Sequence, residues 1–218
     1  MSSVQQRFQD AWRYMPATFV ICALNIAAYF FTAAQSRSLS NNLSDSQLAS
    51  DWVMYGPAVT IYGQWYRLLT SSFLHFGFGH LLMNMLLLIV LAYHLERALG
   101  SLAFAATYLV CAFGAGAAVY IFHPSTPTAG ASGAIYGLMA FLVVQALISK
   151  FDVRAPLTLL LVNIGYTFTL SGISVAGHLG GLVVGLMLAY PLLQAQRRRR
   201  WLYLLLMIFA LSAAVFAF

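Results

Sequence analysis

The segment PTAGASGAIYGLMA, residues 127–140, leads from a proline-containing loop directly into an apolar helix. Ser132 lies at the junction between Gly130 and Gly133, and Tyr136 follows one turn later on the same helical face. The first four N–H groups of a helix have no partner within it, and the helix N-terminus carries a partial positive charge. Ser132 is therefore either a small packing or capping residue, or a nucleophile beside donors that can stabilise an oxyanion.

The composition indicates a membrane protein. Of the 218 residues, 61% are hydrophobic and only 7% are charged, whereas a soluble domain carries about 25% charged residues. Roughly 20 apolar residues span a bilayer, so the sequence predicts an all-α polytopic membrane protein. The fifth apolar stretch is the weakest, because Asn163 and Gly165 interrupt it. The apolar stretches are residues 14–34, 80–99, 101–122, 131–149, 156–171, 177–195 and 201–218.

The distribution of Lys and Arg predicts the orientation. If the N-terminus is cytoplasmic, only Arg37 and Arg67 lie outside, which is a strong positive-inside asymmetry. The asymmetry explains the pI of about 9.6 as a topology signal. We expect a multi-pass protein of the cell (plasma or inner) membrane with its site near the outer face, although the asymmetry itself indicates orientation and not which membrane holds the chain. Nucleic acid is not an expected partner, because apolar stretches bracket the main basic run. The residues placed inside are Arg7, Arg13, Arg97, Lys150, Arg154 and Arg197–Arg200.

The chain divides into three expected segments. Residues 1–13 form a short cytoplasmic N-terminus, residues 14–195 form one membrane domain, and residues 196–218 form a basic linker and an additional transmembrane helix. The first apolar stretch exceeds the roughly 7–15 residues of a signal-peptide core, which favours an uncleaved anchor. A long outer loop covers residues 35–79. Its aromatic second half is either an interfacial belt or the wall of a site.

Two polar side chains begin the second stretch in the motif HLLMN. His80 and Asn84 are four residues apart and so share one helical face. Polar groups within a span are costly and usually have a reason. The pair either holds helices together by a polar contact or supplies hydrogen-bond donors to a site.

The sixth stretch begins with the motif AGHLGGLVVG. His178 lies at its start, and Gly181 and Gly185 follow with the spacing of a small-residue packing seam. The fourth stretch offers Gly133 and Gly137 as a matching surface. Close packing of these two helices would bring a serine and a histidine within hydrogen-bond reach, although His178 alone is equally consistent with a buried structural histidine.

The predicted topology places these groups at one depth. His80, Asn84, Ser132 and His178 all fall at the outer ends of helices, although the topology was derived from Lys and Arg alone. Together they supply a nucleophile, a base and oxyanion donors, which is the set required for acyl transfer. No acid is placed to orient His178, so the sequence favours a Ser–His dyad over a triad. The acids are Asp10, Asp45, Asp51, Glu96 and Asp152.

These motifs resemble the rhomboid intramembrane serine proteases. GASGAIYG, HLLMN and AGHLGG lie on alternate spans, and LERALGS at residues 95–101 is similar to a further family motif. The resemblance extends from about Trp65 to Pro191. It implies a six-helix bundle, to which the last stretch adds a seventh C-terminal transmembrane helix.

The resemblance also implies residue roles. Ser132 is the expected nucleophile and His178 the general base, with Tyr136 packed on the imidazole. His80, Asn84 and the Ser132 backbone N–H form the expected oxyanion hole. The remaining site residues are the helix-packing glycines Gly130, Gly133, Gly137, Gly181 and Gly185.

One loop feature departs from the family pattern. Relatives often carry adjacent Trp-Arg, whereas this chain reads WYR, so that Tyr66 occupies the Trp position and Trp65 is displaced by one residue. Arg67 still matches, and His75 matches a loop histidine. The dyad does not depend on this difference.

The sequence therefore predicts an intramembrane serine endopeptidase that cleaves membrane-anchored proteins whose transmembrane segments unwind easily. Its partners are those substrates and the lipid bilayer, and no metal or cofactor is expected. Two alternatives stay open: a client-binding rhomboid-like protein without proteolytic activity, and a haem protein that uses His80 and His178 as axial ligands.

Overall fold

The computed structural model describes residues 15–169 and 172–218. The predicted cytoplasmic segment 1–13 and the end of the fifth predicted stretch, residues 170–171, lie outside the described residues. Within the described ranges the chain is helical, with one isolated β-bridge between Met54 and Thr128. The predicted all-α polytopic fold is confirmed. The long helices are α2 Pro16–Ser36, α6 Gly77–Leu99, α7 Ser101–Phe122, α8 Ser132–Ile148, α9 Arg154–Thr169, α10 Val175–Gln194 and α11 Arg197–Phe216.

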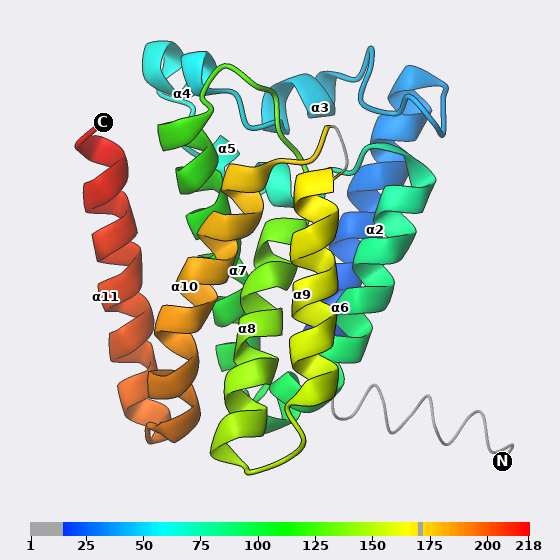
Figure 1. Cartoon of the computed structure of the whole chain (residues 1–218). Coiled ribbons are helices and arrows are strands. Elements are labelled where there is room, and N and C mark those ends of the chain that lie inside the picture. The colour runs from blue at the N-terminus through cyan, green and yellow to red at the C-terminus, as the bar shows by residue number, and fades with distance from the viewer. Residues whose placement is uncertain (1–14, 170–171) are drawn as a thin grey trace, which may run out of the picture.

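Five of the long helices are long and apolar enough to cross a membrane, namely α2, α6, α7, α10 and α11. The helix α8 is apolar but has only 17 residues, which corresponds to about 25 Å against a hydrocarbon core of about 30 Å. In Figure 1 the top of α8 accordingly lies below the tops of α7, α9 and α10. The short helix places its N-terminal residue, Ser132, below the surface of the bundle.

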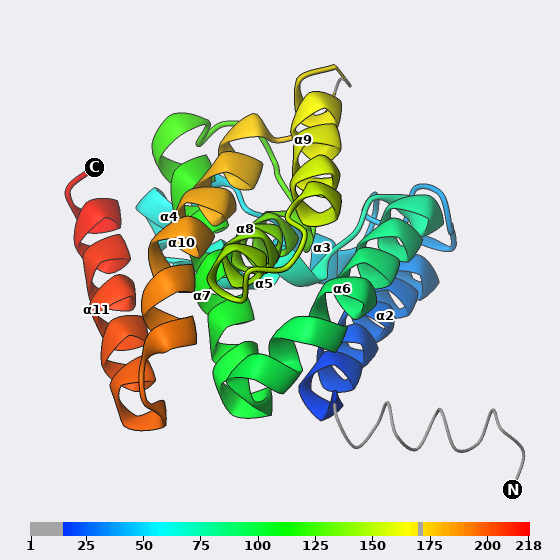
Figure 2. The ribbon, with the colours of Figure 1, turned by 60° about the horizontal axis from the view of Figure 1, so that its bottom comes forward.

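The helix α8 forms the centre of the bundle. Figure 2 shows it surrounded by α6, α7, α9 and α10, and every residue from Gly133 to Phe141 is buried. A helix that is apolar on all sides is expected in such an interior position. In contrast, α9 buries only Leu160 and Thr167, and α11 only Leu204 and Val215, so these two helices lie at the periphery.

Glycines bring the backbones of α8 and α10 into direct contact. A Cβ atom at Gly181 would overlap the carbonyl group of Gly133, and one at Gly185 would overlap the backbone of Gly137. In the other direction, a Cβ at Gly133 would lie 2.9 Å from the carbonyl oxygen of Gly177. Small residues permit this approach in lipid, where dispersion and packing drive helix association.

A buried carboxylate joins α6 to the start of α2. Glu96 is 1% exposed and accepts hydrogen bonds from the N–H groups of Ala17 and Thr18, at 2.9 and 3.0 Å, and from the Thr18 hydroxyl at 2.5 Å. These backbone donors have no partner within their own helix, and the helix N-terminus favours a negative charge. The acid of the LERALGS motif therefore fixes the first helix against the bundle.

The long loop between α2 and α6 folds into a cap over the end of the bundle that was predicted to lie outside (Figure 1). Arg67 is 5% exposed and donates to the carbonyl oxygens of Ser50 and Val53 at 2.7 and 2.8 Å. The ring of Trp65 contacts Phe216 near the end of α11, with centroids 4.8 Å apart. The short elements of this cap are α3 Gln47–Trp52, α4 Gly56–Tyr62, α5 Arg67–Thr70 and the 3-10 helix η1 Ser71–Phe73.

The α8–α10 contact leads to a stability prediction. Gly185→Ala should lower the free energy of unfolding by about 1–3 kcal/mol, because the new methyl group would overlap the backbone at Gly137. Gly165→Ala on α9 is the matched control, since open space surrounds that position and Ala favours a helix over Gly by about 1 kcal/mol. Unfolding of both variants in detergent micelles measures the difference. Equal stability of Gly185→Ala and the parent would contradict the backbone contact.

Candidate active site

The side chains of Ser132 and His178 meet across the α8–α10 contact. Ser132 is the first residue of α8, and His178 lies in the first turn of α10. The Ser132 Oγ is 2.7 Å from the His178 Nε2, which is the hydrogen-bond distance required of a nucleophile and its base. Both residues are partly buried. Three of the glycines between the helices set this separation, since Gly133, Gly177 and Gly181 lie within one turn of the pair.

The imidazole of His178 is held on its face as well. The ring of Tyr136 stacks on it with centroids 4.2 Å apart and planes inclined by 19°. Tyr136 is 3% exposed, and its hydroxyl group bonds to the carbonyl oxygen of Asn163 on α9. The stacking fixes the plane of the imidazole ring and therefore the directions of its two nitrogens.

The second imidazole nitrogen has a partner that the sequence analysis did not identify. His178 Nδ1 lies 2.8 Å from the Thr167 Oγ1 on α9. A signal was present: Thr167 follows Asn163, the polar interruption of the fifth stretch, by four residues and so shares its helical face. Two polar residues on one face of an apolar helix indicate a polar contact with a neighbouring helix, not only a weak span.

The proton position on His80 follows from its backbone neighbour. The N–H of Phe76 donates to the His80 Nδ1 at 3.3 Å, so a neutral His80 carries its proton on Nε2. A Cβ atom added to Gly130 would lie 3.2 Å from that Nε2 and 3.5 Å from the Ser132 Oγ. The Nε2–H donor and the Ser132 hydroxyl therefore flank the same glycine.

Gly130 is required at this position for two reasons. Its φ of +139° lies in a region that residues with a side chain rarely adopt, and a Cβ atom would lie 2.9 Å from the His80 Cε1. Its own N–H donates to the carbonyl oxygen of Ser71 at 3.0 Å. The loop leading into α8 is thus fixed against the cap, and no side chain at position 130 stands between His80 and Ser132.

Asn84 lies one turn below His80 on α6 and is 5% exposed. One hydrogen of its side-chain amide goes to the carbonyl oxygen of His80 at 2.8 Å. An amide NH2 group has two donors, which leaves a second one for a ligand. The structure thus groups His80 with Ser132 around Gly130, and Asn84 is attached to His80 from below.

The β-bridge between Met54 and Thr128 connects the cap by hydrogen bonds to the loop that precedes Ser132. Each residue donates to the carbonyl oxygen of the other at 3.0 Å, and Gly56 N–H donates to Pro124 at 2.7 Å. These bonds connect the long outer loop to the strand-like approach to α8. The long outer loop therefore covers the end of the bundle at which the Ser–His pair lies.

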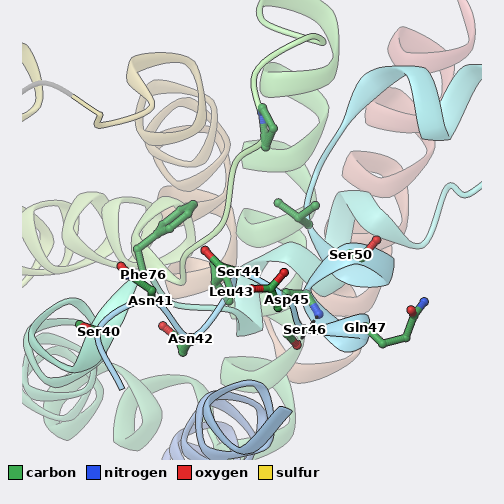
Figure 3. Close-up of a pocket in the computed structure, with 13 residues that line it drawn as sticks. Ser40, Asn41, Asn42, Leu43, Ser44, Asp45, Ser46, Gln47, Ser50 and Phe76 are labelled. Atoms are coloured by element: carbon green, nitrogen blue, oxygen red, sulfur yellow. Dashed lines mark hydrogen bonds between the residues drawn. The ribbon is translucent and has the colours of Figure 1, made fainter. Parts of the chain in front are cut away.

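An open cavity of about 710 Å³ lies in the cap beside this site. Figure 3 shows it lined mainly by the loop from Ser40 to Gln47, with Phe76 on one side. The Phe76 ring is stacked near His80, with centroids 6.3 Å apart and planes at 14°. Ser132 and His178 do not line the cavity, so it adjoins the site without containing it.

Among the described residues, no group of three His, Cys, Asp or Glu side chains is arranged to hold a metal ion. Cys22 and Cys111 are separate, buried thiols. Both nitrogens of His178 are occupied by Ser132 and Thr167, and the His80 Nδ1 accepts from a backbone N–H. This arrangement leaves His178 no free nitrogen for haem iron, which disfavours the haem alternative.

The fold and the site together define a polytopic membrane protein with a serine–histidine pair near one end of the bundle. Residues 62–195 match the sequence model of the Rhomboid domain, which covers more than half of the chain. The chain belongs to the rhomboid family.

Several known proteins are similar to it. Rhomboid protease GluP of Bacillus subtilis is 38% identical over 135 residues, 60% of this chain and 26% of GluP. YdcA of the same organism, provisionally named a rhomboid protease, is 31% identical over 206 residues, 89% of this chain and 97% of YdcA. Rhomboid protease AarA of Providencia stuartii is 26% identical over 250 residues, 96% of this chain and 84% of AarA. The chain thus spans about a quarter of GluP but nearly all of YdcA.

His75, which lies in the loop before α6, makes the stability of the fold depend on pH. Burial lowers the pKa of this fully buried histidine from 6.5 to about 3, and the nearby His80 acts in the same direction. Between those values the unfolded chain binds a proton that the folded chain does not, so stability should fall as the pH falls from about 6.5 toward 3.

Thermal unfolding at a series of pH values tests this on the parent and on His75→Gln. The variant should lose stability less steeply on acidification, whatever its stability at neutral pH. Identical slopes for the two proteins would show that His75 is not the group responsible.

Proposed function

We propose that this chain is an intramembrane serine endopeptidase that cleaves membrane-anchored proteins by a Ser132–His178 dyad. The observation that carries the proposal is the 2.7 Å contact between Ser132 Oγ and His178 Nε2 at the recessed N-terminus of the central helix. Family membership supports it, since relatives named rhomboid proteases share the domain. The proposed catalytic domain is residues 14–195, with residues 196–218 as the added basic linker and helix.

The chemistry follows from the position of each proton. His178 Nε2 takes the Ser132 hydroxyl proton as Oγ attacks the scissile carbonyl carbon. The resulting oxyanion accepts hydrogen bonds from His80 Nε2–H, Asn84 Nδ2–H and the unpaired N–H of Ser132. The imidazolium then gives its proton to the leaving amine as the C–N bond breaks. Water, activated by His178, hydrolyses the acyl-enzyme and regenerates Ser132.

The substrate class follows from the recessed site. An intact helix has its backbone carbonyls in hydrogen bonds, so a transmembrane segment must unwind before Ser132 can reach a peptide bond. Gly costs about 1 kcal/mol and Pro about 3 kcal/mol relative to Ala in a helix, and substrates rich in them should be cut best. We place the N-terminus in the cytoplasm and the site near the outer face of the cell membrane, as the positive-inside asymmetry indicates.

A fluorophosphonate probe tests the nucleophile. The detergent-solubilised parent should be labelled, and Ser132→Ala and His178→Ala should not, because one lacks the attacking oxygen and the other lacks its base. Ser149→Ala, an exposed serine just beyond the other end of α8, should label like the parent. An unlabelled but folded parent would favour the client-binding alternative, in which Ser132 only packs.

The oxyanion donors are tested by the rate of cleavage. Loss of one donor typically slows such a reaction roughly 100- to 1,000-fold, so His80→Ala and Asn84→Ala should retain measurable turnover of a single-span substrate in liposomes. Their KM values should change less than kcat, because the donors act on charge that develops in the transition state. Unchanged kcat in both variants would remove them from the oxyanion hole.

A further inference from the structure

Thr167 is an unusual residue on α9. Most of that helix is exposed or half-buried, but Thr167 is 3% exposed and its hydroxyl oxygen lies 2.8 Å from His178 Nδ1. The same oxygen bonds to the carbonyl oxygen of Asn163 at 3.0 Å and contacts the Tyr136 hydroxyl. One side chain of a peripheral helix thus joins every group that surrounds the imidazole on the side away from Ser132.

The protons of this network favour one tautomer of His178. A threonine hydroxyl has one donor hydrogen and two acceptor positions. The Asn163 carbonyl only accepts, and both the Thr167 and Tyr136 hydroxyls lie against it. If the Thr167 proton goes to Asn163, its oxygen is left to accept from His178 Nδ1–H.

The opposite tautomer satisfies the network less well. With no proton on His178 Nδ1, only the Thr167 and Tyr136 protons would remain to fill four contacts. With the proton on Nδ1, three protons fill the same four contacts. The favoured tautomer leaves Nε2 unprotonated toward Ser132, which is the form a general base requires.

We propose that Thr167 is a positioning residue that holds His178 in the Nδ1–H tautomer, so that α9 supplies a third polar group beside the Ser132–His178 dyad. This rests on the proposed function for its catalytic consequence, but not for the tautomer itself. Threonine is neutral, so it orients the imidazole and accepts a hydrogen bond from the imidazolium without supplying the countercharge of a carboxylate. Since Thr167 and Leu160 are the only buried residues of α9 within the described range 154–169, the Thr167 hydrogen bond orients the base only while α9 lies against α8 and α10. The stacking of Tyr136, which belongs to α8, does not depend on α9 in this way.

The kinetic test compares three variants on a single-span substrate. Thr167→Val keeps the shape and removes the hydroxyl, and kcat should fall roughly 10- to 100-fold, the value of a hydrogen bond to a charged group, with little change in KM. Thr167→Ser should restore kcat to within a few-fold of the parent. Thr169→Val is the matched control, because within the described part of the chain that exposed hydroxyl bonds to Gly165 and Tyr166 of its own helix and to no residue of the site.

A spectroscopic test is independent of activity. The ¹⁵N chemical shifts of the His178 ring, assigned by comparison with His178→Ala, should show a protonated Nδ1 in the parent and in Thr167→Ser. In Thr167→Val they should move toward a mixture of tautomers. If Thr167→Val does not fold, Thr167→Ala takes its place in both tests.

The outcomes separate the two proposals. A folded Thr167→Val variant with the kcat and the His178 ring shifts of the parent would overturn the positioning role. A Thr167→Ser variant whose kcat is as low as that of Thr167→Val would overturn it as well. A parent that neither labels with fluorophosphonate nor cleaves would overturn the proposed function alone. The ring shifts would still report whether Thr167 sets the tautomer.

Discussion

The backbone contact between α8 and α10 is the constraint on which the rest of the structure depends. A methyl group at Gly181 would overlap the backbone of Gly133, and one at Gly133 would lie 2.4 Å from the Ala115 Cβ and 2.9 Å from the Gly177 carbonyl oxygen. Side chains at the starts of the two helices are therefore brought together across a contact in which the two backbones touch. The 2.7 Å separation of Ser132 and His178 follows from this packing, to which one interhelical hydrogen bond adds only about 0.6–2 kcal/mol in lipid.

The second constraint is the cost of polar groups inside a membrane protein. Most of the buried polar side chains of the site are satisfied within short reach: His178 by Ser132 and Thr167, and Asn84 by the His80 carbonyl. Buried polar groups are also paired far from the site. Glu96 accepts three hydrogen bonds from donors at the start of α2. An unpaired group would be costly in a water-poor interior, and each pairing also restricts a side chain to one orientation. The side chains of the site are thus held in fixed orientations because each polar group needs a hydrogen-bond partner inside the membrane protein.

The sequence predicted the helices and the main site residues because their signals are local and periodic. His80 and Asn84 share a face by spacing, and the charge asymmetry placed them at the depth of Ser132 and His178. Two features were not accessible in this way. The recess of Ser132 results from the 17 residues of α8, where the sequence suggested 131–149, and helix ends are set by loop bonds such as Gly130 to Ser71. Thr167 was missed because a threonine is common in apolar helices, and its contacts with Tyr136 on α8 and His178 on α10 arise only from the packing of the helices.

The use of a neutral third group has a physical rationale in this setting. A carboxylate buried beside His178 would carry a desolvation cost of several kcal/mol, and no basic side chain lies in α8, α9 or α10 near the site to offset it. A threonine that already bonds to its own helix backbone at Asn163 adds no charge and still orients the imidazole. Without a carboxylate, no negative charge stabilises the imidazolium. In return, no charged group has to be buried when the site folds within the bilayer. Because the orienting group belongs to the most weakly buried helix around α8, assembly of the base and the position of α9 are linked by one hydrogen bond.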